Sequence, residues 1–239
     1  MTFFKKKTRG KSSILRQVLL LFNVQLLAVL VVMISSIVFM QRLSRERMEA
    51  MAENLVEIYG TQMNNRLTQS WNNLSRIIYD NYDPDLLSSD KERERYYASV
   101  RLHNVLQNIV KTGDDAPLYV IADSAYDICL DAGKKPMAYQ TRNALRDFCM
   151  DKAGGAQTYR NWEFLSIEGN TYLYRMLTRS TRAVAVFFPI SSLLDEIRPE
   201  SVTRMGFYLT DRSGTIQGSR GFTDLEDTKE SFKLQLEAR

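Results

Sequence analysis

One stretch near the N-terminus, residues 18–40, constrains the fold of this chain more than any other. It reads VLLLFNVQLLAVLVVMISSIVFM and contains no charged residue, glycine or proline. The hydrocarbon core of a bilayer is about 30 Å thick and is crossed by roughly 20 apolar helical residues. Because lipid offers the backbone no hydrogen-bonding partner, a helix is the form that suits such a stretch. We expect residues 18–40 to form a transmembrane helix.

Two other interpretations of this stretch fit the residues less well. A helix in the core of a soluble protein normally keeps a polar face, which residues 18–40 lack. A cleaved signal peptide has an apolar region of roughly 7–15 residues followed by a small-residue cleavage site. Here the apolar run is longer, and the residues around its end, FMQRL, offer no such site. The sequence therefore predicts a retained membrane anchor.

The flanking charges predict how this helix is oriented. Six basic residues precede it, and the first acidic residue is Glu46; the six are Lys5, Lys6, Lys7, Arg9, Lys11 and Arg16. Lys and Arg beside a membrane segment are retained on the cytoplasmic side. We expect a single-pass protein of the cell membrane, with residues 1–17 as a cytoplasmic tail and residues 41–239 outside the cytoplasm.

The charge balance of the exported part differs from that of the whole chain. The chain has 32 Lys and Arg against 28 Asp and Glu, and without the six basic residues of the tail 26 remain against 28. The excess of basic residues therefore comes from the cytoplasmic tail, where it determines the orientation of the membrane helix. We expect no nucleic-acid partner. Cys129 and Cys149 both fall in the exported part, where one disulfide or two free thiols are open alternatives.

Residues 41–79 are expected to form a long helix continuous with the membrane helix. Apolar residues recur every three or four positions, which marks one stripe along a helix. The stripe consists of Met48, Met51, Leu55, Tyr59, Met63, Leu67, Trp71, Leu74 and Ile78. We interpret its lower part as the seam of a homodimer formed through residues 18–79 and its upper part as the packing face of a domain.

The remaining pattern predicts an α+β domain. We expect helices at 97–110, 139–152 and 190–197, strands at 118–121, 126–130, 162–167, 171–178 and 182–188, and a hairpin of strands 206–211 and 215–219. The turn between the strands at 162–167 and 171–178 reads Glu168-Gly169-Asn170, which is typical of a tight hairpin. His103 is the only histidine and has no neighbouring ligands at metal-binding spacing.

This order of elements resembles a Cache-type sensor domain, the extracytoplasmic relative of PAS domains. The run AVAVFFPISSLLDEI is similar to the end of a first Cache subdomain, and GFYLTDRSGTIQGS, with turn residues Asp211 and Gly214, is similar to the opening hairpin of a second. The resemblance implies a first, PAS-like subdomain at 80–199 and a partial second subdomain or tail at 200–239. It is strongest to the double-Cache input regions of bacterial sensor histidine kinases, and it implies that this chain is the N-terminal part of a longer receptor.

The resemblance also implies candidate ligand-binding residues. In amino-acid-binding members an Arg-x-Trp pair holds the ligand carboxylate, and Arg160-Asn161-Trp162 matches that pair. Tyr172 and Tyr174 are further candidates, with Arg175 beside them. Two features depart from the family pattern: Glu163 stands where the family has Tyr, and the strand AVAVFF lacks the Asp that would bind the ligand's ammonium group. The alternative is that Arg160 is a surface residue and Trp162 belongs to the core.

The function predicted from these observations is the sensory input portion of a bacterial transmembrane receptor, within a two-component system. The chain has no nucleophile elbow and no Cys/His pair, so we expect no enzymatic activity, no cofactor and no metal. The expected partners are membrane lipid, a second copy and a small-molecule ligand. The alternative is a membrane-anchored scaffold that docks to another protein. An apolar-walled cavity bearing Arg160 would favour the sensor, whereas a filled core with an exposed apolar patch would favour the scaffold.

Overall fold

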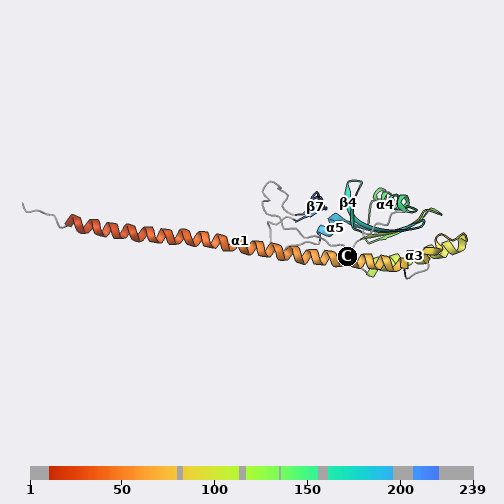
Figure 1. Ribbon diagram of the computed structural model, residues 1–239, viewed down its shortest axis with the longest axis horizontal. Coiled ribbons are helices and arrows are strands. Elements are labelled where there is room, and N and C mark those ends of the chain that lie inside the picture. The colour runs from red at the N-terminus through yellow and green to blue at the C-terminus, as the bar shows by residue number, and fades with distance from the viewer. Residues whose placement is uncertain are drawn as a thin grey trace, which may run out of the picture. The chain divides into compact units, whose positions relative to one another are not determined.

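The computed structural model describes residues 11–79, 83–112, 117–134, 136–155, 161–195 and 207–220 (Figure 1). The chain divides into two compact units, residues 1–56 and residues 57–239. Most of the predicted tail (1–17), Arg160 and much of 200–239 lie outside the described residues. The long N-terminal helix belongs to both units, and all the strands lie in the second.

Helix α1 (Lys11–Tyr79) is a single α-helix of 69 residues. This confirms the prediction that 41–79 is helical and continuous with 18–40. The helix contains a segment long and apolar enough to cross a membrane, and the side chains there are exposed. Membrane anchors and signal sequences both contain apolar segments of this kind.

A five-stranded antiparallel sheet forms the centre of the second unit. Its strands are β1 (Leu118–Asp123), β2 (Ile128–Gly133), β3 (Glu163–Ile167), β4 (Asn170–Arg179) and β5 (Arg182–Pro189). The order across the sheet is β2-β1-β5-β4-β3, so the first hairpin joins the later three strands through β1 and β5. The α+β prediction is confirmed, and each of the five predicted strands is present, with ends shifted by up to three residues.

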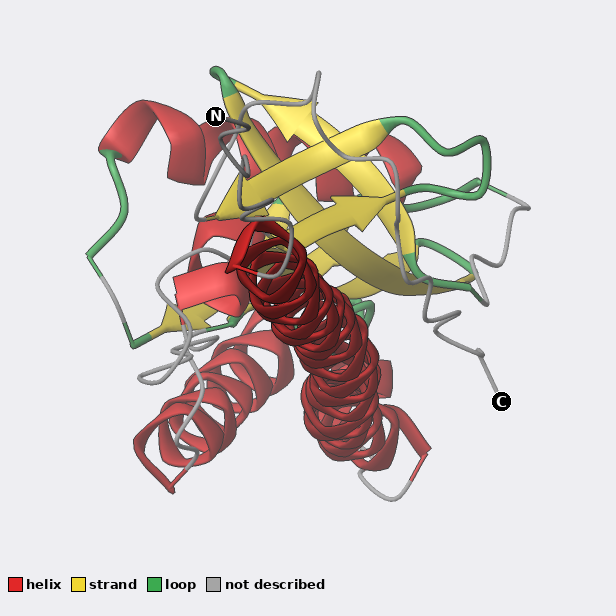
Figure 2. Cartoon of the chain, turned by 90° about the vertical axis from the view of Figure 1, so that its left-hand side faces the viewer, coloured by secondary structure: helices red, strands yellow, loops and turns green. Residues whose placement is uncertain are grey.

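One face of this sheet packs against the last part of α1 and against α3 (Glu92–Thr112). The buried side chains come from both helices and from alternate strand positions; they include Leu67, Leu74, Ile77, Leu102, Leu106, Ile121 and Val186. Figure 2 shows these helices on the same side of the strands. The predicted upper stripe of α1 is therefore a domain-packing face. Helix α2 (Asp83–Leu86) lies between α1 and α3 in the sequence.

The opposite face of the sheet is covered by α4 (Tyr139–Lys152), whose bounds match the prediction. Leu145 and Cys149 on α4 are fully buried against the other set of alternate strand residues, among them Phe187 and Met176. In Figure 1 α4 and α3 lie on opposite sides of the strands. Cys129 and Cys149 are free thiols, so of the two alternatives the structure has the unbonded pair.

A small hairpin follows the sheet after the short helix α5 (Ile190–Asp195). Its strands are β6 (Phe207–Thr210) and β7 (Ile216–Arg220), close to the predicted pair. Arg220 donates a hydrogen bond of 2.8 Å to the carbonyl of Leu194 and pairs with Asp195. The hairpin is thereby attached to α5, which continues directly from the sheet.

Candidate ligand-binding site

The sequence-predicted site residues that the structure describes lie on β4 and just before β3. Tyr172 and Tyr174 are buried on β4, and Trp162 immediately precedes β3 and is half-buried. Arg160 lies outside the described residues, so its geometry with Trp162 is not part of the structure. These three aromatic residues can contact one ligand only if they share a face of the sheet.

Tyr172 and Tyr174 both point toward α4. The ring of Tyr174 stacks on Phe187 with centroids 5.7 Å apart and meets Phe148 edge-on at 5.3 Å. Its hydroxyl donates a 3.0 Å hydrogen bond to Oε2 of Glu163, the residue at which the chain departs from the family pattern. Burial raises the pKa of Tyr172. The space beside Tyr174 is filled by aromatic rings of the core.

Trp162 lies on the other face of the sheet, toward α1 and α3. Its ring meets Phe188 edge-on with centroids 5.9 Å apart, and Phe188 belongs to the core beneath α1. The structure thus brings Tyr172 and Tyr174 together but places Trp162 across the sheet from them. A single ligand could contact all three side chains only if it reached both faces of the buried sheet.

A different basic residue accompanies Trp162. The register pairs Glu163 with Tyr174, so residue 162 lies opposite Arg175 on the neighbouring strand. The guanidinium carbon of Arg175 lies 4.0 Å from the ring centroid of Trp71 on α1. This stacking is a cation–π contact, in which the ring's negative face attracts the cation. The Nε of Arg175 is buried and has no hydrogen-bond partner among the described residues.

Sequence reasoning missed this pairing of Arg175 with Trp71. The sequence pattern places Trp71 in the apolar stripe of the helix and Arg175 beside the candidates Tyr172 and Tyr174. The alternation along β4 carried the signal, because Arg175 falls among residues of the helix-facing set, two positions after the buried Leu173. A charged residue among buried residues normally needs an ion-pair partner or a bound ligand, because burying an unpaired charge is costly.

Two other polar clusters have structural roles. Fully buried Asp123 accepts hydrogen bonds from Ser88, from Thr181 at 3.4 Å and from the backbone N–H of Ala125 at 2.8 Å. These contacts fasten the segment before α3 to the ends of β1 and β5. Because the carboxylate of Asp123 is satisfied by this chain's own donors, it is not a free catalytic group.

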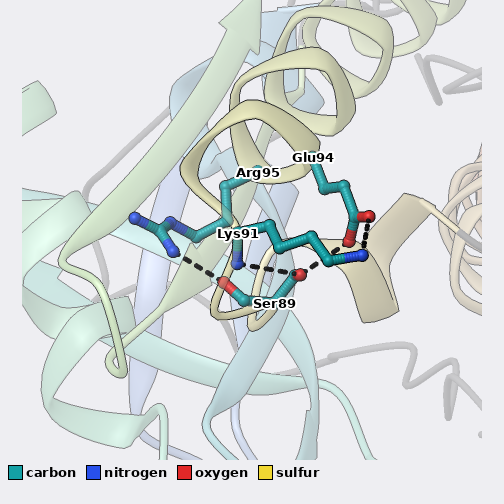
Figure 3. A network of polar contacts seen from close by, with 4 residues as sticks. All are labelled: Ser89, Lys91, Glu94 and Arg95. Atoms are coloured by element: carbon teal, nitrogen blue, oxygen red, sulfur yellow. Dashed lines mark hydrogen bonds and ion pairs between the residues drawn. The ribbon is translucent and has the colours of Figure 1, made fainter.

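The second cluster lies where α3 begins (Figure 3). Ser89 donates to Glu94 at 2.8 Å, Lys91 pairs with Glu94 at 2.8 Å, and Arg95 donates to the carbonyl of Ser89 at 2.6 Å. Hydrogen bonds from Lys91 and Ser89 lower the pKa of Glu94. The network is partly exposed and closes the first turn of the helix, which accounts for the charge run without a ligand.

Among the described residues there is no group of three or more His, Cys, Asp or Glu that could hold a metal ion. Cys129 and Cys149 have raised pKa values because both thiols are withdrawn from water. A raised pKa favours the protonated thiol over the thiolate that nucleophilic chemistry needs.

Comparison with known proteins leaves the family open. No protein-family model matches the sequence, and no curated protein is significantly similar to it.

Proposed function

We propose that this chain is the extracytoplasmic sensory input portion of a bacterial transmembrane receptor of the Cache type. In this proposal residues 18–40 anchor it in the cell membrane once, residues 1–17 are cytoplasmic, and the domain is exported. The domain binds a small molecule, and α1 passes the resulting shift toward the membrane. The order of elements supports the Cache assignment, since a long helix is followed by two strands, a helix and three strands.

The observation that carries this proposal is the double role of α1. The same uninterrupted helix contains the apolar segment and contributes Leu67, Leu74 and Ile77 to the domain core. Packed cores respond to a ligand by small rigid shifts of helices rather than by gradual deformation. A shift of the sheet against Leu74 is therefore a shift of the helix that carries the anchor.

The proposal also includes a homodimer formed through residues 18–79. Below the domain-packing part of α1, Met48, Met51 and Ile58 are exposed, at 56%, 62% and 52% of their full surface. Their spacing, with Leu55 between them, alternates three and four residues, as the seam of a parallel helix pair requires. Anchoring in one membrane would align two copies in parallel.

A scaffold function is the second candidate, and one observation favours it. Tyr96, Tyr97 and Val100 on α3 are exposed, at 63%, 47% and 42%. Exposed aromatic and aliphatic side chains that lie together are typical of protein-docking surfaces. In this alternative the domain binds another envelope protein through α3 and has no small-molecule ligand.

A thermal-shift screen of the full chain in lipid nanodiscs tests the sensory function. A ligand that binds only the folded state stabilises it by about 2.7 kcal/mol at a hundred times its dissociation constant. The panel is the twenty amino acids, simple carboxylates and sugars. A reproducible rise in melting temperature from any class supports the sensor, and its loss in Arg160→Ala assigns the Arg160–Trp162 pair. No shift from a well-folded protein contradicts the sensor and favours the scaffold.

A further inference from the structure

The exposed methionines of α1 belong to a line of residues that continues into the apolar segment. Met48 and Met51 lie three residues apart, and Leu55 follows four residues later. Extending this alternation of three and four toward the N-terminus gives one set of positions, which we call the seam; it adds Ser44, Gln41, Ile37, Ile34, Leu30, Leu27 and Asn23. Residues with this spacing lie along one side of a helix and form the contact line of a parallel helix pair.

The seam avoids the charged residues that follow the apolar segment. Four of the seven residues 41–47 are charged, yet the two that the alternation selects, Gln41 and Ser44, are uncharged. Off the seam, Nε of Arg42 lies 3.2 Å from Oε1 of Glu46, so these two charges pair within one helix. A second helix can therefore lie along the seam without burying a charge at the centre of the contact.

Asn23 is the polar residue at which the seam reaches the apolar segment. Its Nδ2 donates a 2.9 Å hydrogen bond to the carbonyl of Leu19, one turn earlier in the same helix. Among the described residues its Oδ1 accepts no hydrogen bond. Lipid tails have no donor for this oxygen, and a polar atom left without a partner in hydrocarbon is costly. Oδ1 of Asn23 therefore needs a donor from outside its own helix.

A second copy of this chain supplies such a donor. In a parallel pair each seam residue lies beside its own counterpart, so Asn23 faces Asn23. A side-chain amide both donates and accepts, which lets it bond to an identical group. Gln25, the other amide of the apolar segment, is about 200° around the helix axis from Asn23 and so lies on the opposite side.

We infer that Asn23 and its counterpart in a second copy form a hydrogen bond between the two α1 helices inside the membrane. This bond holds the helices parallel and in register along the seam, because any other register leaves both amides without partners. The strict repeat of seven residues implies that the two helices wind around each other with a left-handed twist. The inference rests on the proposed function, since it gives the homodimer of that proposal its contact and its register.

Energy transfer between donor-labelled and acceptor-labelled copies of the full chain in detergent micelles measures the dissociation constant of the dimer. In Asn23→Leu this constant should rise by about threefold to thirtyfold, the effect of losing one polar contact between membrane helices. Gln25→Leu is the matched control, because it removes an amide from the opposite side, and it should leave the constant unchanged. Asn23→Gln keeps an amide on the seam and should restore most of the association.

Disulfide cross-linking in native membranes tests the register independently. Ser44→Cys places a thiol on the seam, whereas Glu46→Cys places one on the opposite side of the same turn. With copper phenanthroline as oxidant, Ser44→Cys should yield a covalent dimer on a non-reducing gel, and Glu46→Cys should yield much less. The unaltered protein gives the background from Cys129 and Cys149. Adding Asn23→Leu to Ser44→Cys should lower the yield.

Two results would overturn the inference. The first is an equal dissociation constant for Asn23→Leu and the unaltered protein, which would mean that the amide is satisfied by water or lipid headgroups. The second is cross-linking through Glu46→Cys that matches Ser44→Cys, which would place the contact on another side of α1. Either result leaves the sensory function standing, because ligand binding is measured separately by the thermal-shift screen. A chain that is monomeric in both assays would refute the homodimer as well.

Discussion

The ring of Tyr59 on α1 meets the ring of Phe207 on β6 edge-on, with centroids 5.9 Å apart. These residues are 148 positions apart in the chain and join the hairpin that follows the sheet to the helix that precedes it. Together with the sheet and α3, the hairpin thus holds the part of α1 that belongs to the domain.

Leu74 anchors α1 in the core. Its side chain is completely buried between the helices and the sheet. Leu74→Ala should lower the free energy of unfolding by about 2–5 kcal/mol, because it removes buried methyl groups and leaves a cavity. Urea denaturation followed by circular dichroism measures this change. Asn72→Ala, at an exposed position of the same helix, is the control, and an equal loss in both variants would contradict the packing described here.

Gly218 allows β7 to lie against α5. A Cβ at this position would collide with Cγ2 of Ile190 and lie 3.1 Å from Cδ1 of Leu194. Gly218→Ala should therefore cost about 1–3 kcal/mol, the usual effect of overpacking, and weaken protection of residues 207–220 from hydrogen exchange. Ser219→Ala is the matched exposed control.

A second substitution tests the cause of that loss. Ile190→Ala makes room for the added methyl group, so the double variant should be more stable than the sum of the two single losses predicts. Strict additivity would mean that Gly218 and Ile190 do not meet, and the contact between β7 and α5 would be refuted.

Tyr174 and Glu163 form a cross-strand hydrogen bond at the edge of the sheet. Tyr174→Phe and Glu163→Ala should each cost about 0.5–1.5 kcal/mol, as expected for one hydrogen bond in a partly buried setting. A double-mutant cycle isolates the pair: the coupling energy should be positive. A coupling energy of zero would show that the hydroxyl finds its stabilisation elsewhere.

The buried thiol of Cys149 makes stability depend on alkaline pH. Burial raises its pKa in the folded protein well above the ordinary value. As pH rises past about 8.5, the thiol ionises in the unfolded chain while it stays protonated in the folded one. The stabilising contribution is thus present below that pH and is lost above it.

The measurement compares urea unfolding at pH 7.5 and pH 9.5. The unaltered protein should lose up to about 1.4 kcal/mol per pH unit above the unfolded pKa through this thiol. Cys149→Ala lacks the group and should show a shallower decline, although it starts from a lower stability. Equal declines in the two proteins would mean that Cys149 is accessible to solvent and titrates alike in both states.

Most of the fold follows from local patterns in the sequence. The apolar spacing of 139–152 predicts α4 to the residue, because one face of that helix packs on the sheet and the other is solvated. The end of β1 was less predictable. Asp123 resembles a turn residue, yet it extends the strand, because Ser88 and Thr181, both distant in sequence, satisfy its buried carboxylate.

The candidate site could be predicted only in part. The short turn Glu168-Gly169 fixes the register of β3 and β4, and both residues have the positive φ angles that such a turn requires. This register places Trp162 opposite Arg175 and away from Tyr172. The stacking of Arg175 on Trp71 could not be predicted from the local sequence pattern, because it depends on how α1 packs across the sheet.

The central claim is that residues 18–40 anchor an exported domain in the membrane, and protease accessibility in bacterial spheroplasts tests it most directly. The full chain is expressed with a different epitope at each end, and protease is added before and after detergent lysis. The account predicts an intact, membrane-bound chain whose C-terminal epitope is lost in spheroplasts while its N-terminal epitope survives until lysis. A soluble chain lacking the N-terminal epitope, or a domain protected until lysis, would contradict it.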